Sequence, residues 1–341
     1  MRSAERKPRP LTLRDLIRQS VRALREARVS FGHGTTNARD EGVYLTLHAL
    51  GLSLDTSGWD FPVSQRSAEK VLTLVARRIE ERKPAAYLTH EAWLGEFRFY
   101  VDERVIVPRS YIAELFKDGL APWIRPRHIR SALDLCTGSG CLAILLAHGF
   151  PRTRVDAADI SRDALAVARR NVKEYRLGDR ITLTRSDIYA ALEQRRYDLI
   201  VSNPPYVTAA AMRTLPAEYR REPSIALAGG SDGLNLVKRI VHDAPDHLER
   251  GGWLVVEVGH ARARVEHAFP RLPFIWADTS GGDDCVFLIS REALVQGLAP
   301  SAPATAAAPS LRRKAARPPA RASGAAAARS RRNAPASGGS R

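Results

Sequence analysis

The 341-residue sequence predicts an α/β fold: a mostly parallel sheet that ends in an antiparallel hairpin, preceded by a small helical domain and a β-hairpin linker. From residue 131 onward, short apolar strands alternate with helix-length segments, which is typical of a parallel sheet covered on both faces. The last two apolar segments have no helix-length segment between them, so they can pair antiparallel. Before residue 87, apolar residues recur at helical spacing, which favours the helical domain.

Three helices are predicted in the helical domain, residues 12–86. Thr12 is placed to cap the first helix, Asp40 to begin the second and Ser67 to cap the third. The domain shows no chemistry of its own. His33, for example, has no partner acid or cysteine at useful spacing, so we expect it to be packed or at the surface rather than catalytic.

Residues 87–109 change to a period of two, which predicts the β-hairpin linker with its turn at Asp102 and Glu103. Arg109 ends this linker, at the junction with the strand–helix domain of residues 110–297. Two interpretations of Arg109 stay open: a structural salt bridge, or a residue that positions the substrate or a lid.

The strand–helix domain should carry the functional site, because the carboxyl ends of parallel strands meet at one edge of a sheet and ligands bind there. Its expected strands are 132–135, 154–159, 181–184, 197–201, 253–258, 274–277 and 285–289, and its expected helices are 142–147, 164–172 and 234–248.

The positive charge of the chain is concentrated at its ends. Residues 298–341 contain nine Arg or Lys and no acid, and residues 1–11 carry a net +3, which leaves +4 of the total of +16 for the body. Both segments have too few apolar side chains to offset the entropy lost on ordering. We therefore expect a disordered basic arm and a disordered Ala/Pro/Arg-rich basic tail.

The three cysteines, Cys136, Cys141 and Cys285, have neither metal-ligand nor disulfide spacing, so we expect no metal site and no disulfide framework. There is no apolar run of membrane length and no signal-peptide pattern. We therefore expect a cytoplasmic protein that does not contact a membrane.

A glycine-containing loop, residues 134–140, follows the first strand of this domain and precedes a helix. Glycines allow the backbone to approach a ligand closely, and the following helix offers free N–H groups. A dinucleotide site would require G-x-G-x-x-G, but Cys136 takes the place of the first glycine. Asp134 is an anion suited to the ammonium group of S-adenosylmethionine, which favours that cofactor.

Two further acids follow the next two strands. Asp159 can accept both ribose hydroxyls of a nucleoside. Asp187 can accept from the adenine amine while Ile188 packs against the ring. Three carboxylates at successive strand ends, together with the glycine loop, predict a pocket for the methyl donor.

The segment Asn203-Pro204-Pro205-Tyr206 follows the fourth strand and predicts the chemistry. Its two prolines hold the turn rigid. The oxygen of Asn203 and the carbonyl of Pro204 can accept the two N–H hydrogens of a planar amide or aryl amine, with the Tyr206 ring against it. This orients the nitrogen lone pair and favours the developing positive charge, so no strong base is needed. The residues alone allow adenine or glutamine as the methyl acceptor.

Motifs at these positions resemble those of the bacterial protein-glutamine methyltransferases, which have a Rossmann-like fold and modify the glutamine of a Gly-Gly-Gln motif in translation proteins. The motifs are DLCTGSG (134–140), VDAADIS (155–161), SDIY (186–189), SNPPYV (202–207) and GGSDGL (229–234). Residues 90–110 and 31–41 resemble the branch that acts on the third protein of the large ribosomal subunit. The resemblance implies that the cofactor is contacted by Cys136, Thr137, Gly138, Ser139, Gly140, Asp159, Ile188 and Asn203. It also implies that residues 203–206 hold the substrate glutamine.

We therefore predict an S-adenosylmethionine-dependent enzyme that methylates a glutamine amide in a ribosomal protein, with the helical domain recognising the partner and Arg109 among the substrate contacts. The alternatives are methylation of peptide-chain release factors, a nucleic-acid adenine methyltransferase and a non-catalytic RNA-binding module. Two hypotheses stand for the tail: a solubilising appendage, or a contact with ribosomal RNA through counterion release.

Overall fold

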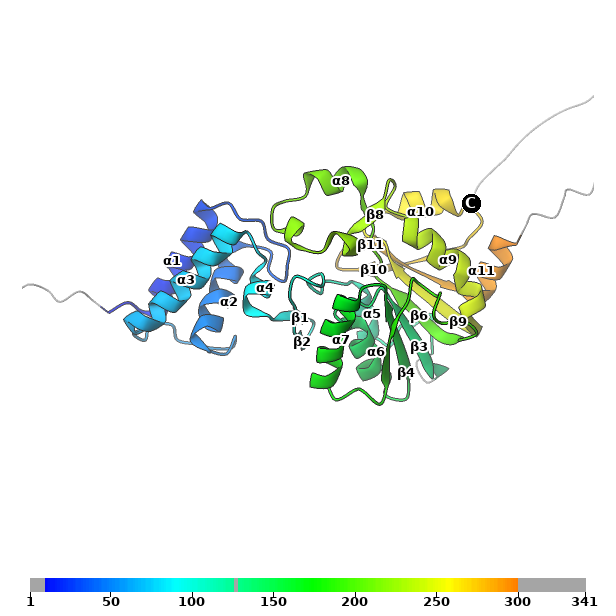
Figure 1. The fold of residues 1–341 in the computed structure, drawn as a ribbon, viewed down its shortest axis with the longest axis horizontal. Coiled ribbons are helices and arrows are strands. Elements are labelled where there is room, and N and C mark those ends of the chain that lie inside the picture. Colours follow the sequence, from blue (N-terminus) through cyan, green and yellow to red (C-terminus); the bar gives the residue numbers. More distant parts are fainter. Residues whose placement is uncertain (1–9, 126–127, 300–341) are drawn as a thin grey trace, which may run out of the picture. The chain divides into compact units, whose positions relative to one another are not determined.

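The computed structural model describes residues 10–125 and 128–299 (Figure 1). Its main element is a seven-stranded sheet with the order β10-β11-β9-β6-β3-β4-β5. The strands are β3 (Ser131–Leu135), β4 (Arg154–Asp159), β5 (Ile181–Arg185), β6 (Tyr197–Ser202), β9 (Leu248–Glu257), β10 (Ile275–Thr279) and β11 (Gly282–Ser290).

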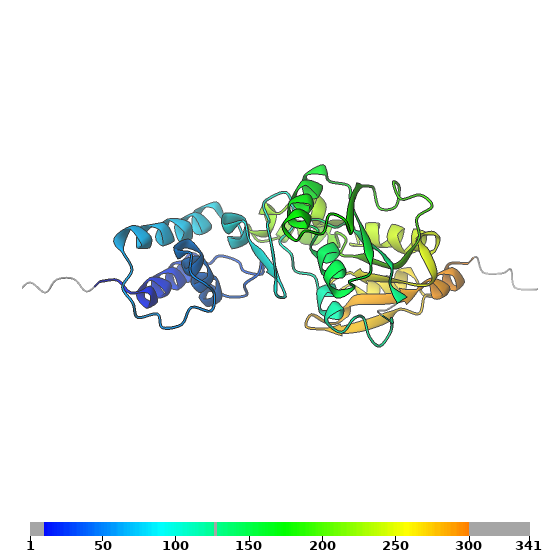
Figure 2. The same cartoon turned by 90° about the horizontal axis from the view of Figure 1, so that it is seen from below.

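The sheet has the predicted mixture of directions. The pairs β3–β4, β3–β6, β4–β5 and β6–β9 are parallel. Strand β11 pairs antiparallel with both β9 and β10, so the chain closes the sheet with a hairpin at one edge (Figure 2). The prediction of a mostly parallel sheet with an antiparallel terminal hairpin is confirmed, and each predicted strand lies within the observed one or departs from it by one residue, except that β9 begins five residues earlier.

Helices cover both faces of the sheet (Figure 1). Side chains of α5, α6 and α7 pack on one face, and those of α9, α10 and α11 pack on the other. Successive residues of β3 alternate between the faces, Ala132 in one core cluster and Leu133 in the other, as the pleat requires. The helices are α5 (Ile112–Lys117), α6 (Cys141–Gly149), α7 (Arg162–Glu174), α9 (Asn235–His247), α10 (Arg262–Ala268) and α11 (Arg291–Leu298).

The N-terminal part contains α1 (Leu13–Glu26), α2 (Ala38–Leu50), α3 (Gln65–Glu81) and the short α4 (Ala85–Thr89). Thr12 caps α1 as predicted, in a capping box with Asp15. The predicted starts of the next two helices are wrong by two or three residues. Asn37, not Asp40, caps α2, and Ser64, not Ser67, caps α3, because their side chains lie one turn earlier and accept the first free N–H groups.

The hairpin occurs earlier in the linker than predicted. Strand β1 (Ala92–Leu94) pairs antiparallel with β2 (Phe97–Phe99), and Gly95, with φ of +62°, makes the turn. The turn expected at Asp102 and Glu103 is present, since Val105 N–H donates to the Asp102 carbonyl at 3.2 Å, but it does not join two paired strands. The Asp102 carboxylate also accepts hydrogen bonds from the backbone and the guanidinium of Arg104. The apolar segment that follows, residues 105–107, is packed without strand pairing.

An insertion between β6 and α9 was not predicted. It contains β7 (Val207–Thr208), α8 (Ala209–Thr214), two 3₁₀ turns at Tyr219–Arg221 and Ser224–Ala226, and β8 (Ala228–Gly230), which pairs parallel with β7. Helices α10 and α11 were also missed, because each is too short for a clear apolar period.

The predicted disordered arm and tail fall almost entirely on residues 1–9 and 300–341, which lie outside the described residues. At their inner ends the chain is structured: Leu11 accepts a hydrogen bond from Val63, and Leu298 ends α11. Within the described ranges, no helix combines the length and apolar character needed to cross a membrane.

A buried ion-pair cluster joins α2, α3 and the insertion. The side chain of Arg78 is 1% exposed and bonds Glu41 at 2.8 Å and Glu218 at 3.3 Å. It also donates to the carbonyl of Ser30. Glu218 is also bonded by Arg82 at 3.2 Å, whereas Arg78 is the cation that compensates the charge of Glu41.

We expect Arg78→Leu to lower the free energy of unfolding by about 3–5 kcal/mol, because it leaves the buried Glu41 without its cation and takes one of two cations from the buried Glu218. The adjacent Arg77 forms an exposed i,i+4 pair with Glu81 and is the matched control; Arg77→Leu should cost about 0.5 kcal/mol. Urea unfolding of both variants measures this. Equal losses would contradict the assignment.

Candidate active site

A cavity of about 420 Å³ lies at the carboxyl ends of β3, β4, β5 and β6. Strand β3 lies between β4 and β6, so the chain reverses its direction across the sheet here, which is where open α/β sheets bind ligands. The size is within the usual range for small-molecule sites. Seven of the predicted site residues line this cavity: Cys136, Gly138, Asp159, Asp187, Ile188, Asn203 and Pro205.

The loop between β3 and α6 forms one wall. Gly138 and Gly140 have φ of +55° and +80°, and a Cβ at Gly140 would lie 3.2 Å from the Cβ of Ala168 on α7. Cys136 also has a left-handed φ of +60°, a conformation that favours glycine. Burial raises the pKa of its thiol, so the side chain stays neutral.

Asp134 lies beneath this loop rather than at the cavity surface. It is fully buried, and its Oδ2 accepts from the Thr137 hydroxyl and from the backbone N–H of Ala143 in the first turn of α6. Its Oδ1 has no hydrogen-bond partner among the described residues. Burial raises its pKa to about 7, opposed by these two hydrogen bonds. Asp134 therefore ties the loop to α6, and its predicted contact with the cofactor ammonium stays a prediction.

The remaining predicted loop residues also lie beneath the cavity. Thr137 and Ser139 are 5% and 3% exposed, and neither they nor Gly140 line the cavity. Thr137, Ser139 and Gly140 therefore shape the loop from below. Cys136 and Gly138 are the loop residues that line the cavity.

Asp159 lies at the end of β4 with its carboxylate at the cavity. Its Oδ2 accepts from Gly138 N–H and its Oδ1 from Ser161 N–H, both at 2.9 Å. Burial raises its pKa, and the two backbone hydrogen bonds oppose this shift. Each oxygen keeps a second lone pair, so the carboxylate can still accept from a diol.

Asp187 and Ile188 follow β5. The Asp187 carboxylate forms a bidentate ion pair with Arg239 of α9, with both distances 3.0 Å. Ile188 has φ of +53°, which is a genuine outlier for a β-branched residue. The Ser186 hydroxyl holds this turn by donating to the carbonyl of Ile188 at 2.7 Å. Strain of this kind is typical of functional sites.

The loop 203–206 forms the wall beyond β6. Asn203 and Pro205 line the cavity, whereas Pro204 and Tyr206 do not. Among the described residues, none hydrogen-bonds the side-chain amide of Asn203, which is therefore available to a ligand. Asn203, the residue to which the sequence assigns the amide contact, therefore lies at the cavity.

The segment GGSDG (229–233) packs directly behind this loop. A Cβ at Gly229 would lie 2.7 Å from Tyr206 Cα and 2.8 Å from the Pro205 carbonyl oxygen, and a Cβ at Gly233 would lie 2.4 Å from the Tyr206 carbonyl oxygen. These glycines are required because two backbones approach each other closely. Gly229 and Gly233 thus let this segment pack against the backbone of Pro205 and Tyr206, which supports the loop that carries Asn203.

Sequence reasoning missed Glu257, which is fully buried at the end of β9. Its Oε2 accepts from the Ser110 hydroxyl at 2.6 Å and from Tyr111 N–H at 2.9 Å, and its Oε1 accepts from the Tyr206 hydroxyl at 3.4 Å. Burial raises its pKa to about 7. An acid within the apolar run 253–258 was the signal that could have revealed it.

Arg109 lies in an ion pair rather than at the cavity. It donates to both oxygens of Glu222, at 2.6 and 2.7 Å, which is the structural interpretation of this residue. His33 is packed, as expected, with Nε2 3.5 Å from Glu222. Burial alone would raise the pKa of Glu222, but the contacts with His33 and Arg109 hold it at about 2. A substrate contact by Arg109 stays a prediction.

Among the described residues, His260, Asp284 and Cys285 are a group whose ligand atoms lie within 4.8 Å of one another. Their polar atoms bond mainly to one another. The three cysteines are free thiols, as the sequence predicts.

The sequence of this chain matches one family model and is similar to several relatives that share one name. The family model "Methyltransferase small domain" matches residues 118–218. The ribosomal protein uL3 glutamine methyltransferase of Bordetella pertussis is 56% identical over 83% of this chain and 96% of that protein. The protein of the same name from Neisseria meningitidis is 53% identical over 83% and 94%. Among solved structures, a methyltransferase from Pyrococcus furiosus has 17% identity and a TM-score of 0.42, over 67% of this chain and 99% of that chain.

Fold, cavity and family model together define an enzyme of the methyltransferase class, with S-adenosylmethionine as its cofactor. The identity and coverage of the sequence relatives are more specific. The chain belongs to the ribosomal protein uL3 glutamine methyltransferase family. The resemblance seen in the motifs is thereby confirmed.

We expect Glu257→Gln to change how stability depends on pH. The folded-state pKa of about 7 exceeds the unfolded value of 4.5, so the stabilisation by protonated Glu257 is complete below about 4.5 and is lost as pH rises through 7. Relative to wild type, the variant should gain up to about 3 kcal/mol in unfolding free energy between pH 4.5 and 8.

Urea unfolding across this pH range measures the difference. The exposed Glu249 on the same strand provides the control, since Glu249→Gln should follow the wild-type curve. A Glu257→Gln curve parallel to wild type would mean that Glu257 does not titrate in this window.

Proposed function

We propose that this enzyme transfers a methyl group from S-adenosylmethionine to the side-chain amide nitrogen of a glutamine in ribosomal protein uL3. The observation that carries the proposal is the open amide of Asn203, held by the di-proline turn at a cofactor-sized cavity. The names of the relatives supply the substrate. They do not favour release factors or nucleic-acid adenine as the acceptor.

The residues of the cavity fit this cofactor. We propose that Asp159 accepts from the ribose hydroxyls, that Ile188 packs against the adenine, and that Asp187 accepts from its amine while paired with Arg239. The carboxylate, amide and apolar side chains around one cavity are the donor set that a nucleoside needs. When bound, the cofactor supplies an electrophilic methyl group on a positively charged sulfur.

The role of Asn203 follows from the chemistry of an amide. Its nitrogen is a poor nucleophile, because the lone pair is delocalised into the carbonyl. The Asn203 oxygen and the Pro204 carbonyl would accept the two N–H hydrogens, orient the lone pair and stabilise the developing positive charge. The methylated nitrogen is acidic and loses its proton to water. This is consistent with the cavity walls, where no described residue is a His or Lys.

Residues outside the cofactor cavity would contact the substrate protein. Tyr206 is oriented by Glu257, which supports its proposed place against the glutamine side chain. We propose that residues 12–86 and the linker 87–109 recognise the protein partner. Contact of the tail, residues 298–341, with ribosomal RNA stays a hypothesis.

Incubation with labelled methyl donor and undermethylated uL3, followed by mass spectrometry, tests the substrate. We expect one labelled glutamine in uL3. An undermethylated release factor is the matched competitor. Preferential labelling of the release factor, or of an adenine in DNA, would overturn the proposal.

Two substitutions separate the proposed roles. Asn203→Ala should reduce methyl transfer by about 100-fold or more, as removal of a preorganised transition-state contact does, with cofactor affinity largely retained. Asp159→Asn should weaken cofactor binding by about 10- to 100-fold, since a hydrogen bond to a charged group contributes about 1.5–3 kcal/mol.

Calorimetry gives the cofactor affinity and single-turnover assays at saturating cofactor give the transfer rate. Each variant is the control for the other. Near-normal turnover of Asn203→Ala, or unaltered cofactor affinity of Asp159→Asn, would refute the corresponding role.

A further inference from the structure

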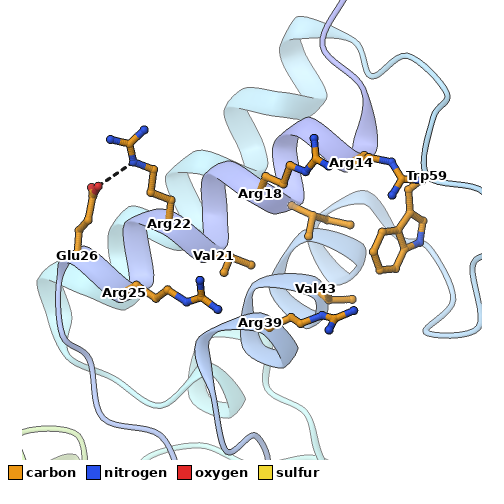
Figure 3. Close-up of a pocket in the computed structure, with 10 residues that line it drawn as sticks. Arg14, Arg18, Val21, Arg22, Arg25, Glu26, Arg39, Val43 and Trp59 are labelled. Carbon is orange, nitrogen blue, oxygen red and sulfur yellow. Dashed lines mark hydrogen bonds and ion pairs between the residues drawn. The ribbon is translucent and has the colours of Figure 1, made fainter.

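A second, strongly basic groove lies on the outer surface of α1 and α2, away from the cavity residues described above. It has a volume of about 570 Å³, and five arginines line it: Arg14, Arg18, Arg22, Arg25 and Arg39 (Figure 3). We call this surface the arginine groove. The apolar side chains of Ile17, Val21 and Val43 also line it. Trp59 lies at one end (Figure 3). Glu26 is the single acid among its described lining residues.

The spacing on α1 places four of these cations on one face of the helix, since residues 14, 18, 22 and 25 are separated by four, four and three positions. Like charges at this spacing destabilise a helix by a few tenths of a kcal/mol per pair. Arg39 lies in the first turn of α2, where the helix dipole also disfavours a cation. A gain in helix stability therefore does not explain why five arginines lie together on α1 and α2.

Local acids neutralise only part of the charge. Glu26 bonds Arg22 at 2.7 Å, and Asp60, just outside the groove, bonds Arg14 through both oxygens. Within the described ranges, neither Arg25 nor Arg39 forms an ion pair. Arg18, Arg25 and Arg39 are all exposed. The groove therefore presents unneutralised guanidinium groups to an external partner.

The chemistry of the groove selects its partner. Guanidinium groups bind phosphates in a planar, bidentate geometry. A row of them beside an aromatic ring is the arrangement that binds single-stranded nucleic acid, with phosphates on the cations and a base stacked on the ring. A protein that resides in ribosomal RNA must neutralise phosphates and is itself basic, so the groove would repel it.

We propose that the arginine groove binds the phosphate backbone of RNA, and that the enzyme thereby engages ribosomal RNA that carries its protein substrate. The second half of this statement rests on the proposed function; the first half rests on the groove alone. Contacts to RNA and to the protein would then be made by different surfaces of the same N-terminal part.

The test uses the full-length chain, so that the basic tail contributes equally to every sample. The groove variant combines Arg18→Gln, Arg25→Gln and Arg39→Gln. The control removes the same charge from three exposed arginines elsewhere, by Arg169→Gln, Arg250→Gln and Arg264→Gln. The probe is a fluorescent single-stranded oligouridylate of about 20 nucleotides, long enough to fill a single-strand groove.

Binding is measured across a salt series. Each phosphate contact contributes about 0.7 to the slope of log K against log salt for a single strand. We expect the groove variant to lose about 2 from this slope, and the control variant to lose clearly less. Replacing the same three groove arginines with lysine should restore most of the slope, since lysine keeps the charge.

Two results would overturn the proposal: equal slopes for the groove and control variants, or displacement of RNA by polyglutamate of equal charge at equal concentration. The latter would indicate an acidic protein segment as the partner. Methyl transfer to free uL3 is measured in parallel. If wild type shows no transfer but the slopes differ as expected, the proposed function fails and the RNA site stands.

Discussion

The carboxylate of Glu257 is the interaction on which the geometry of the site most depends. It lies at the end of β9, fully buried, and joins three positions: Ser110 directly after the linker, Tyr111 before α5, and Tyr206 in the loop after β6. A buried acid with these donors is favourable only while all three segments keep their places. The hydrogen-bonding needs of one side chain thus couple the linker to the loop that presents Asn203.

Two other loops of the site have strained backbone conformations that neighbouring residues stabilise. Cys136 and Ile188 both take left-handed conformations, which cost of order 1–3 kcal/mol each. The surrounding structure opposes relaxation: Asp134 ties the first loop to α6, and Ser186 closes the turn at Ile188. The walls of the cavity are therefore preorganised by the sheet, which suits a reaction that depends on proximity and orientation.

Charge is arranged differently in the two parts of the chain. In the interior, Arg78 and Arg109 are matched to buried acids of the insertion, Glu218 and Glu222. On the outer face of α1 and α2 the arginines exceed the acids, and the excess is exposed. The first arrangement holds the insertion that packs against the loop 203–206, and the second leaves an exposed cationic surface. The buried ion pairs and the exposed groove both use arginine, so the composition of the sequence could not distinguish the two kinds of arginine.

The sequence by itself determined the strands, their mostly parallel direction and seven of the residues that line the cavity. Each follows from a local rule: apolar alternation, a glycine loop before a helix, an acid after a strand, two prolines in a turn. Only the tertiary structure decided which polar groups meet. Glu257 and Ser110 are separated by 147 residues, and Arg109 and Glu222 by 113. Such pairs leave no periodic trace, so the turn at Gly95, the insertion and the partners of Asp134 and Arg109 could not be predicted. Their positions depend on which buried charges the completed fold brings within hydrogen-bond distance.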